Sequence, residues 1–191
     1  MEKRIKIDKV WWRNVQLGEF YNIERDPKLV SGGGSLYIEI PSSLVEDTLL
    51  FLGVPESWLG SNTPIKIHAA SLNSPTEAGV IEFQSKNGGR MRIARQNRKQ
   101  RNSIRHPAWT EEHGFPKAPD GLPNEREAYR SYFPDGGLRI YIIKSVEGEY
   151  FAGFTKGHRP EGLDKSDPNW DLYPESSRVP GGIISAQMGG D

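Results

Sequence analysis

The sequence predicts a mainly β protein with one or two short helices, folded as a seven- or eight-stranded open β-barrel. Short segments in which apolar and polar residues alternate recur along the chain, which is the pattern of half-buried strands. The chain contains 21 Gly and 14 Pro, a content typical of many turns and loops. Hydrophobic residues make up 35% of its 191 residues, which is enough for the core of one globular domain.

The first half of the chain predicts short strands around one helix. Alternating residues indicate strands at residues 17–24, 36–40, 64–68 and 79–83. The helix is expected after Pro41, because Ser43 followed by Glu46 has the spacing of a capping box and apolar residues follow at helical intervals. Gly53 is expected to end this helix.

The second half combines an irregular region with further strands. Residues 98–136 contain five prolines, too many for a continuous element, although residues 125–130 could form a short helix. The clearest hairpin of the chain joins residues 138–143 to residues 149–154 through a turn that contains a glycine. Residues 179–185 are expected to add a last strand.

The domain organisation and the cell compartment follow from coarser features. We expect residues 1–186 to form a single domain and residues 187–191 to begin a linker to an absent catalytic domain, because the end of the chain is rich in glycine. The charged amino terminus does not resemble a signal peptide, and no run of eighteen apolar residues occurs. Since the chain also lacks Cys, we expect a cytoplasmic protein with no membrane partner and no disulfide framework.

Residues 86–105 are the most unusual stretch, because they hold eight of the 25 Lys and Arg residues and no Asp or Glu. Gly88 and Gly89 predict a hairpin turn, after which Arg90 and Arg92 alternate with apolar residues and share one face. Arg suits the edge of guanine, and the interleaved Asn and Gln suit adenine. The stretch therefore indicates a DNA contact surface, with a merely solvated charged face as the alternative.

Three segments together match a known family. Residues 32–46 (GGGSLYIEIPSSLVE), 92–95 (RIAR) and 179–185 (VPGGIIS) occur in its order. They resemble the glycine pair and Ile-Pro-Ser-x-x-Val-Glu helix start, the Arg-Ile-Thr-Arg strand and the closing Pro-Gly-x-x-Ile-Ser segment of the amino-terminal DNA-binding domain of EcoRII-type restriction endonucleases. The resemblance spans about residues 15–186, and identities are sparse outside these blocks.

The resemblance implies a DNA-binding pseudobarrel, the B-three-like fold, which clamps the major groove with an N-arm and a C-arm. Carried onto this chain, the N-arm is residues 22–35, with the DNA-binding candidates Asn22, Glu24, Arg25, Asp26, Lys28 and Ser35. The C-arm is residues 84–97, and its candidates, with one from the following loop, are Lys86, Asn87, Arg90, Arg92, Arg95, Asn97 and Arg98. The chain departs from the family in having Gly34 in place of a His and Arg90-Met91 in place of Glu-Lys. Carboxylates in the N-arm suit cytosine amino groups, or else pair with the neighbouring cations.

The function implied is that of the target-recognition or effector domain of a restriction endonuclease. Its partner is double-stranded DNA with a CC(A/T)GG-like target, and binding needs no cofactor. Mg²⁺ is expected only for the nuclease domain on the same full-length chain. A transcription-factor-like regulator with the same barrel is one alternative.

A small GIY-YIG-like nuclease is the other alternative, suggested by residues 139–141 (RIY), residues 150–153 (YFAG) and Arg159. Other catalytic patterns are missing from the sequence. Pro134-Asp135 is not followed by Asp/Glu-x-Lys, and the four His residues lack the spacing of metal ligands. We therefore expect no enzyme activity from this chain by itself.

Overall fold

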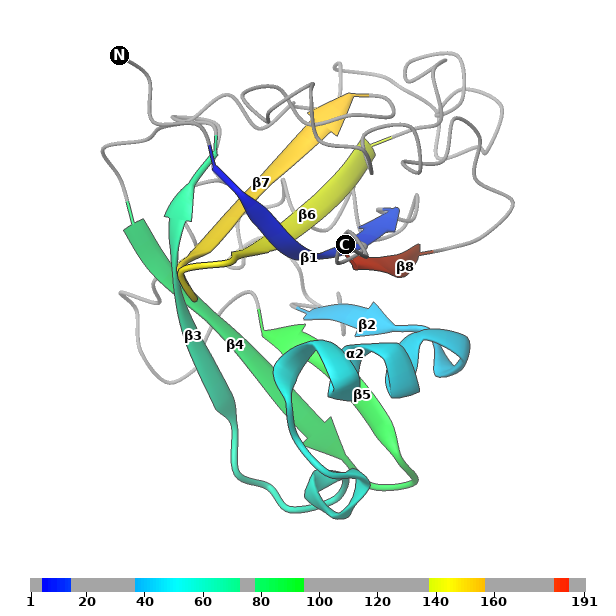
Figure 1. Cartoon of the computed structure of the whole chain (residues 1–191). Helices are drawn as coiled ribbons and strands as arrows, with labels where there is room; N and C mark the ends of the chain where they lie inside the picture. Colours follow the sequence, from blue (N-terminus) through cyan, green and yellow to red (C-terminus); the bar gives the residue numbers. More distant parts are fainter. Residues whose placement is uncertain (1–4, 15–36, 73–77, 95–137, 157–180, 186–191) are drawn as a thin grey trace, which may run out of the picture.

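The computed structural model describes residues 5–14, 37–72, 78–94, 138–156 and 181–185 (Figure 1). Its strands are β1 (Ile7–Asn14), β2 (Tyr37–Ile40), β3 (Ile65–Ser71), β4 (Ala78–Lys86), β5 (Arg90–Ala94), β6 (Leu138–Ser145), β7 (Tyr150–Lys156) and β8 (Gly181–Ser185). Its helices are the α-helix α2 (Val45–Leu52) and the 3-10 helices η1 (Ser42–Leu44) and η2 (Glu56–Trp58). The described residues are therefore mainly β, as the sequence predicts.

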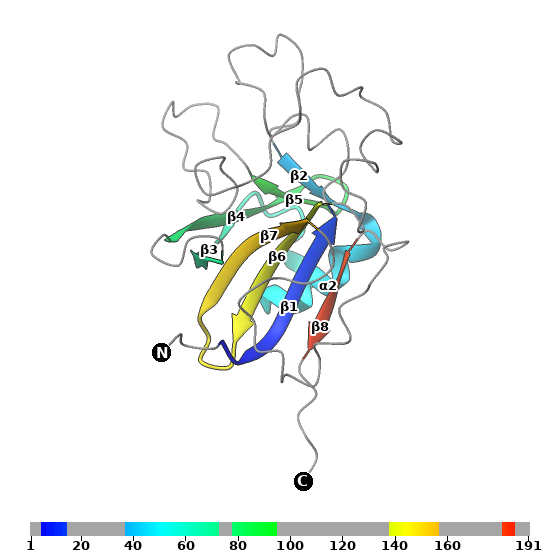
Figure 2. The same cartoon turned by 90° about the horizontal axis from the view of Figure 1, so that it is seen from above.

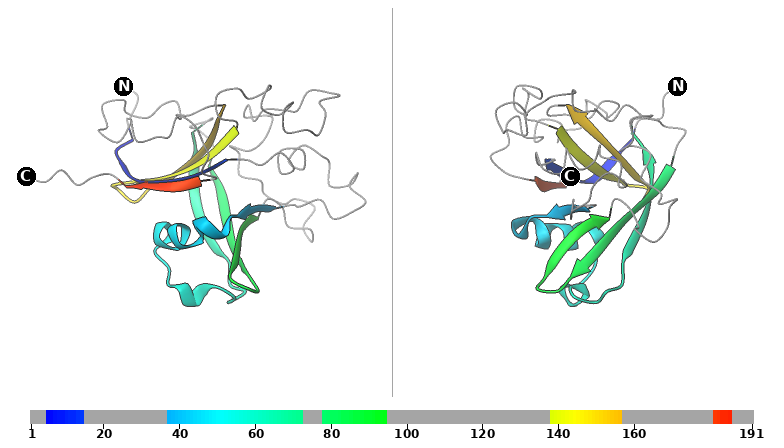
Figure 3. Two further views of the ribbon diagram at one scale, coloured as in Figure 1. Left: turned by 90° about the vertical axis from the view of Figure 1, so that its right-hand side faces the viewer. Right: turned by 180° about the vertical axis from the view of Figure 1, so that it is seen from behind.

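All eight described strands belong to one sheet, in the order β2-β5-β4-β3-β7-β6-β1-β8. Neighbouring strands are antiparallel except β3 and β7, whose parallel seam pairs Ala69 with Tyr150 and Ser71 with Ala152. The sheet curls, so that β3, β4 and β5 turn away from the wall formed by β7, β6, β1 and β8 (Figures 2 and 3). The result is an eight-stranded open half-barrel, which confirms the predicted fold class.

Helix α2 lies beside the edge strands β2 and β8 and packs into the concave side of the sheet (Figure 1). Its Leu49 and Phe51 are buried in the main core cluster. Its Thr48 accepts a hydrogen bond from Trp11 Nε1 of β1 at 2.9 Å and donates one to the Leu44 carbonyl at 2.6 Å. The buried indole N–H is thus satisfied, and the helix is fixed against β1.

Strand β1 is buried on both faces, and this explains why alternation did not reveal it. Trp11 belongs to the main core, where its ring meets Phe83 edge-on at 6.2 Å, whereas Val10 and Trp12 join a second cluster with Tyr141. Four consecutive residues, Val10 to Arg13, are therefore buried, so β1 shows no alternation of buried and exposed positions there. The prediction missed β1, and the strand predicted at residues 17–24 lies outside the described residues.

The other predicted strands among the described residues are present, and the structure extends several of them. Strands β3, β4 and β6 each continue beyond the predicted end, to Ser71, Lys86 and Ser145. The turn between β6 and β7 contains Gly148 with a φ of 82°, a value that favours glycine. The predicted short helix at residues 125–130 and the predicted linker at residues 187–191 lie outside the described residues.

The predicted capping box is wrong, although the helix itself is confirmed. Pro41 opens the 3-10 turn η1, so Ser43 already lies inside a helical turn when α2 begins, and Leu44 is the N-cap residue without a side-chain cap. Ser43 is exposed and does not occupy an N-cap position, so it is not placed to cap the first N–H groups of α2. The end of the helix is as predicted, because Gly53 adopts the left-handed conformation with a φ of 68°.

Candidate nucleic-acid interface

Strands β4 and β5 form a hairpin whose two faces differ in chemistry. Pairing places Lys86 opposite Arg90 and Gln84 opposite Arg92, so these four side chains project from one face. We call the outward residues Glu82, Gln84, Lys86, Arg90 and Arg92, with Asn87 at the tip, the hairpin face. The expectation that the basic side chains after the turn share one face is confirmed for Arg90 and Arg92.

The opposite side of the hairpin holds it in the barrel. Ile81 and Phe83 of β4 and Met91 and Ile93 of β5 are all fully buried in the main core. Near the tip, Ser85 Oγ accepts a hydrogen bond from the backbone N–H of Gly60. Since turning the hairpin over would expose the buried side chains to water, the polar face is fixed on the outside.

The tip of the hairpin is a three-residue connection, Asn87-Gly88-Gly89, between the paired residues Lys86 and Arg90. Gly88 and Gly89 have φ values of 77° and 71°, which a residue with a Cβ rarely adopts. Asn87 and Arg90 are exposed at this end. The predicted Gly-Gly turn is confirmed, and it presents an amide and a guanidinium at the end of the hairpin.

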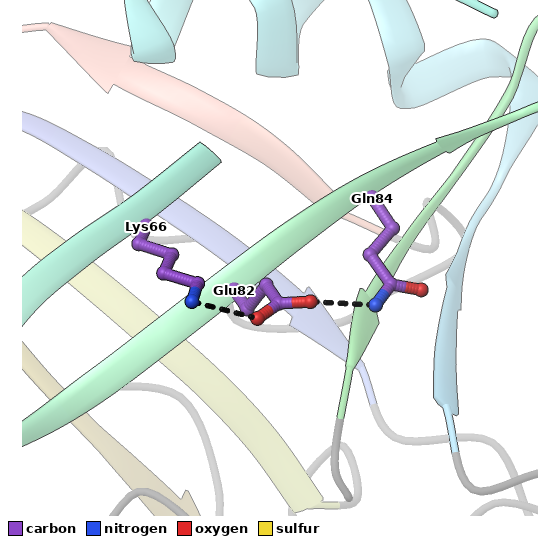
Figure 4. A network of polar contacts seen from close by, with 3 residues as sticks. All are labelled: Lys66, Glu82 and Gln84. Atoms are coloured by element: carbon purple, nitrogen blue, oxygen red, sulfur yellow. Dashed lines mark hydrogen bonds and ion pairs between the residues drawn. The ribbon is translucent and has the colours of Figure 1, made fainter. Parts of the chain in front are cut away.

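A chain of polar contacts crosses the hairpin face (Figure 4). Lys66 Nζ of β3 lies 3.7 Å from Glu82 Oε2, and Gln84 Nε2 donates a hydrogen bond to Glu82 Oε1 at 2.6 Å. Arg92 Nε then donates to Gln84 Oε1 at 2.9 Å. The side chains of three strands are therefore linked in one row that includes Arg92, a partly buried residue.

The charges around the hairpin face are mixed, with an excess of cations. The neighbouring strands add Lys66 and His68 from β3 and Glu39 from β2, which is paired with Arg92 in the register. Lys66 is 58% exposed and Glu82 is 28% exposed, so solvent screens their ion pair and we assign it little stabilising energy. Its role is to orient Glu82.

The structure brings together four of the predicted DNA-binding residues. Lys86, Asn87, Arg90 and Arg92 all lie on the hairpin face. The other candidates lie outside the described residues: Asn22, Glu24, Arg25, Asp26, Lys28 and Ser35 of the N-arm, and Arg95, Asn97 and Arg98.

Lys66, Glu82 and Gln84 were not among the DNA-binding residues predicted from the sequence. A signal for two of them was present, since Glu82 and Gln84 precede Lys86 at intervals of two residues and must share its face of a strand. The link from Gln84 to Arg92 and the link to Lys66 needed the register of three strands, which alternation within one segment does not give.

Two buried arginines lie elsewhere, near the end of β1 and the start of β6. Arg13 is 1% exposed and Arg139 is fully buried. Arg139 Nε donates to Asn14 Oδ1 at 2.9 Å, and its guanidinium carbon lies 4.7 Å from the centre of the Trp12 ring. These contacts make Arg139 part of the packing between β1 and β6.

Tyr141 and Tyr150 of the nuclease alternative lie in described strands, whereas Arg159 lies outside the described residues. Tyr141 is fully buried in the second core cluster, opposite Gly153 in the register. Burial raises the pKa of Tyr150, and the negative charge of Asp8 raises this pKa further.

The described residues contain neither a group of metal ligands nor a membrane-spanning helix. Within these ranges, no group of three or more His, Asp or Glu side chains is placed to hold a metal ion. No described helix has the length and apolar character needed to cross a bilayer.

Comparisons with protein-family models, curated proteins and solved structures found no match to this chain. The resemblance to EcoRII-type domains therefore rests on the three sequence segments quoted above.

Proposed function

We propose that this chain binds double-stranded DNA sequence-specifically, as the target-recognition or effector domain of a restriction endonuclease. The observation that carries the proposal is the hairpin face, on which Lys86, Asn87, Arg90 and Arg92 project from a β-ribbon whose other side is buried. The resemblance adds an N-arm, a CC(A/T)GG-like target and an Mg²⁺-dependent nuclease domain elsewhere on the full-length chain. The cytoplasmic location is proposed from the lack of a signal-peptide pattern and of Cys.

The dimensions of a β-hairpin suit the major groove. Two paired strands lie about 4.8 Å apart, and the major groove, about 12 Å wide, admits a two-stranded ribbon with its side chains. Arg can form two parallel hydrogen bonds to guanine, and Asn can do so with adenine. Lys86 at the rim of the tip is suited to phosphate, which gives affinity without sequence information.

The test is a titration of the purified chain with labelled duplexes, followed by fluorescence anisotropy. We expect a duplex containing CC(A/T)GG to bind about 10³-fold more tightly than a duplex with the same bases in scrambled order. Selection from random duplexes gives the motif directly if the target differs from CC(A/T)GG. Equal affinity for all duplexes after selection would contradict the proposal.

A further inference from the structure

We infer that Glu82 and Gln84 are positioning residues that orient Arg92 toward a guanine edge and thereby set base specificity. The inference deepens the proposed function and rests on it. Its basis is the row of contacts on the hairpin face, which includes a hydrogen bond of 2.9 Å from Arg92 Nε to Gln84 Oε1. Glu82 and Gln84 themselves need not touch DNA for this role.

The direction of each hydrogen bond in the row is dictated by chemistry. A guanidinium only donates and an ionised carboxylate only accepts, whereas an amide does both at opposite atoms. Gln84 must therefore turn Nε2 toward Glu82 and Oε1 toward Arg92, as observed at 2.6 and 2.9 Å. Because Lys66 lies 3.7 Å from the other oxygen of Glu82, each member of the row restrains the next.

This arrangement matters for base reading because a long side chain loses much rotamer freedom when it binds. Ordering such a side chain on association costs conformational free energy. Arg92 is partly buried and already held at Nε, so part of this ordering is complete before DNA arrives. The neighbouring Arg90 is exposed at the tip of the hairpin, and we expect it to contact a phosphate rather than a base.

The decisive variant is Gln84→Met, which keeps the length of the side chain and the net charge but removes both hydrogen bonds. We expect the ratio of specific to non-specific affinity to fall about tenfold. This loss lies at the lower end of the discrimination that one bidentate base contact supplies. Non-specific affinity and its dependence on salt should stay within about twofold, because no charge changes. An unchanged ratio in Gln84→Met, with a wild-type chain that discriminates, overturns this inference and leaves the proposed function intact.

A swapped double variant, Glu82→Gln with Gln84→Glu, is the matched control. It has the same composition and charge, and the new carboxylate at position 84 can accept from both Arg92 Nε and the amide at position 82. We expect it to recover most of the specificity ratio that Gln84→Met loses. Failure of the swap to recover any discrimination, in a protein with an unchanged melting temperature, would also overturn the inference.

A base analogue tests the guanine contact itself. Replacing the guanines of the target by 7-deazaguanine removes the N7 acceptor that an Arg fork uses. The wild-type chain should lose more discrimination on this duplex than Gln84→Met does, because the variant has already lost part of the contact. Equal losses in the two proteins would exclude coupling between Gln84 and guanine reading. If the wild-type chain binds no duplex, the proposed function and this inference fail together.

Discussion

Arg90 and Arg92 share a strand face, but their surroundings differ. Arg90 is exposed next to the Gly88-Gly89 turn, whereas Arg92 is partly buried and hydrogen-bonded to Gln84. A phosphate contact tolerates many orientations of the side chain, but a base contact needs one. If the hairpin face binds DNA as proposed, we expect Arg90 to contribute mainly affinity and Arg92 mainly specificity.

The two arginines should respond differently to removal. We expect Arg92→Ala to cost about 1–3 kcal/mol in specific binding and to relax the preference for the target. Arg90→Ala should weaken binding to all duplexes similarly and reduce the salt slope by about 1. Anisotropy titrations on specific and scrambled duplexes at several salt concentrations measure both quantities. The exposed Lys6, beside the β6–β7 turn, provides the control Lys6→Ala, which should change neither.

Tyr150 offers a prediction that does not depend on DNA. Its pKa lies above the ordinary value of 10.0, mainly because burial disfavours the phenolate and then because Asp8 repels it. Phe51 packs edge-on against the ring, and Lys144 Nζ lies 6.0 Å from its centre. Asp8→Asn should lower this pKa toward 10 without reaching it, as measured by NMR of labelled tyrosine, with Tyr150→Phe identifying the signal.

The sign of the pH effect on stability follows from this shift. The unfolded chain releases the Tyr150 proton near pH 10, while the folded chain still holds it, so unfolding becomes easier as the pH rises through this range. We expect the free energy of unfolding to fall more steeply above pH 10 in the wild type than in Tyr150→Phe. Parallel curves for the two proteins would show that burial does not raise this pKa.

At the scale of elements, strand β8 lies close against its neighbours at the sheet edge because glycine occupies two of its positions. A Cβ on Gly181 would lie 2.6 Å from the Trp12 carbonyl oxygen and 2.7 Å from Leu44 Cδ2. At Gly182 the nearest atom is Trp12 Nε1, at 3.2 Å. The backbone of β8 therefore approaches β1 and η1 more closely at Gly181 than another residue would allow.

Substitution at these two glycines should give a graded response. We expect Gly181→Ala to lower the free energy of unfolding by about 1–3 kcal/mol, because the added methyl meets backbone and cannot be accommodated without displacing β8. Gly182→Ala, whose methyl meets only the indole side chain, should cost less. Urea denaturation of both variants measures the difference, and an equal cost at the two positions would argue against the close approach of Gly181.

The elements that could be predicted from the sequence are those with one buried face. Strands β4 and β5 alternate in the chain as they do in the sheet, so their hairpin and the common face of Arg90 and Arg92 could be read directly. Strand β1 is buried on both sides and gives no alternation, and the start of α2 depends on the 3-10 turn set by Pro41. The role inferred for Gln84 required pairing between strands, which is a long-range property.

At the scale of the whole molecule, charge distribution matters more than total charge. The chain has a formal net charge of zero, yet residues 86–105 hold eight cations and no carboxylate. The net charge of the whole chain predicts weak binding to DNA. The excess of cations in residues 86–105 instead predicts strong binding that depends on salt. A titration with duplex DNA distinguishes these two expectations.

We expect DNA affinity to fall by roughly 100-fold between 50 and 200 mM salt, the response for about four phosphate contacts at a slope of about 0.9 each. The measurement is the anisotropy titration repeated at four or five salt concentrations, with a non-specific duplex alongside. A flat response would contradict the assignment of the basic stretch to DNA.

The parallel seam between β3 and β7 also bears on how the chain folds. Ala69 and Tyr150 are neighbours in the sheet although 80 residues lie between them in the sequence, and β1 pairs with β6 across a still longer interval. Such pairings close large loops, so they form slowly, whereas the β4–β5 and β6–β7 hairpins need only short ones. We therefore expect refolding in milliseconds to seconds, with the two ribbons appearing first and β1 docking last.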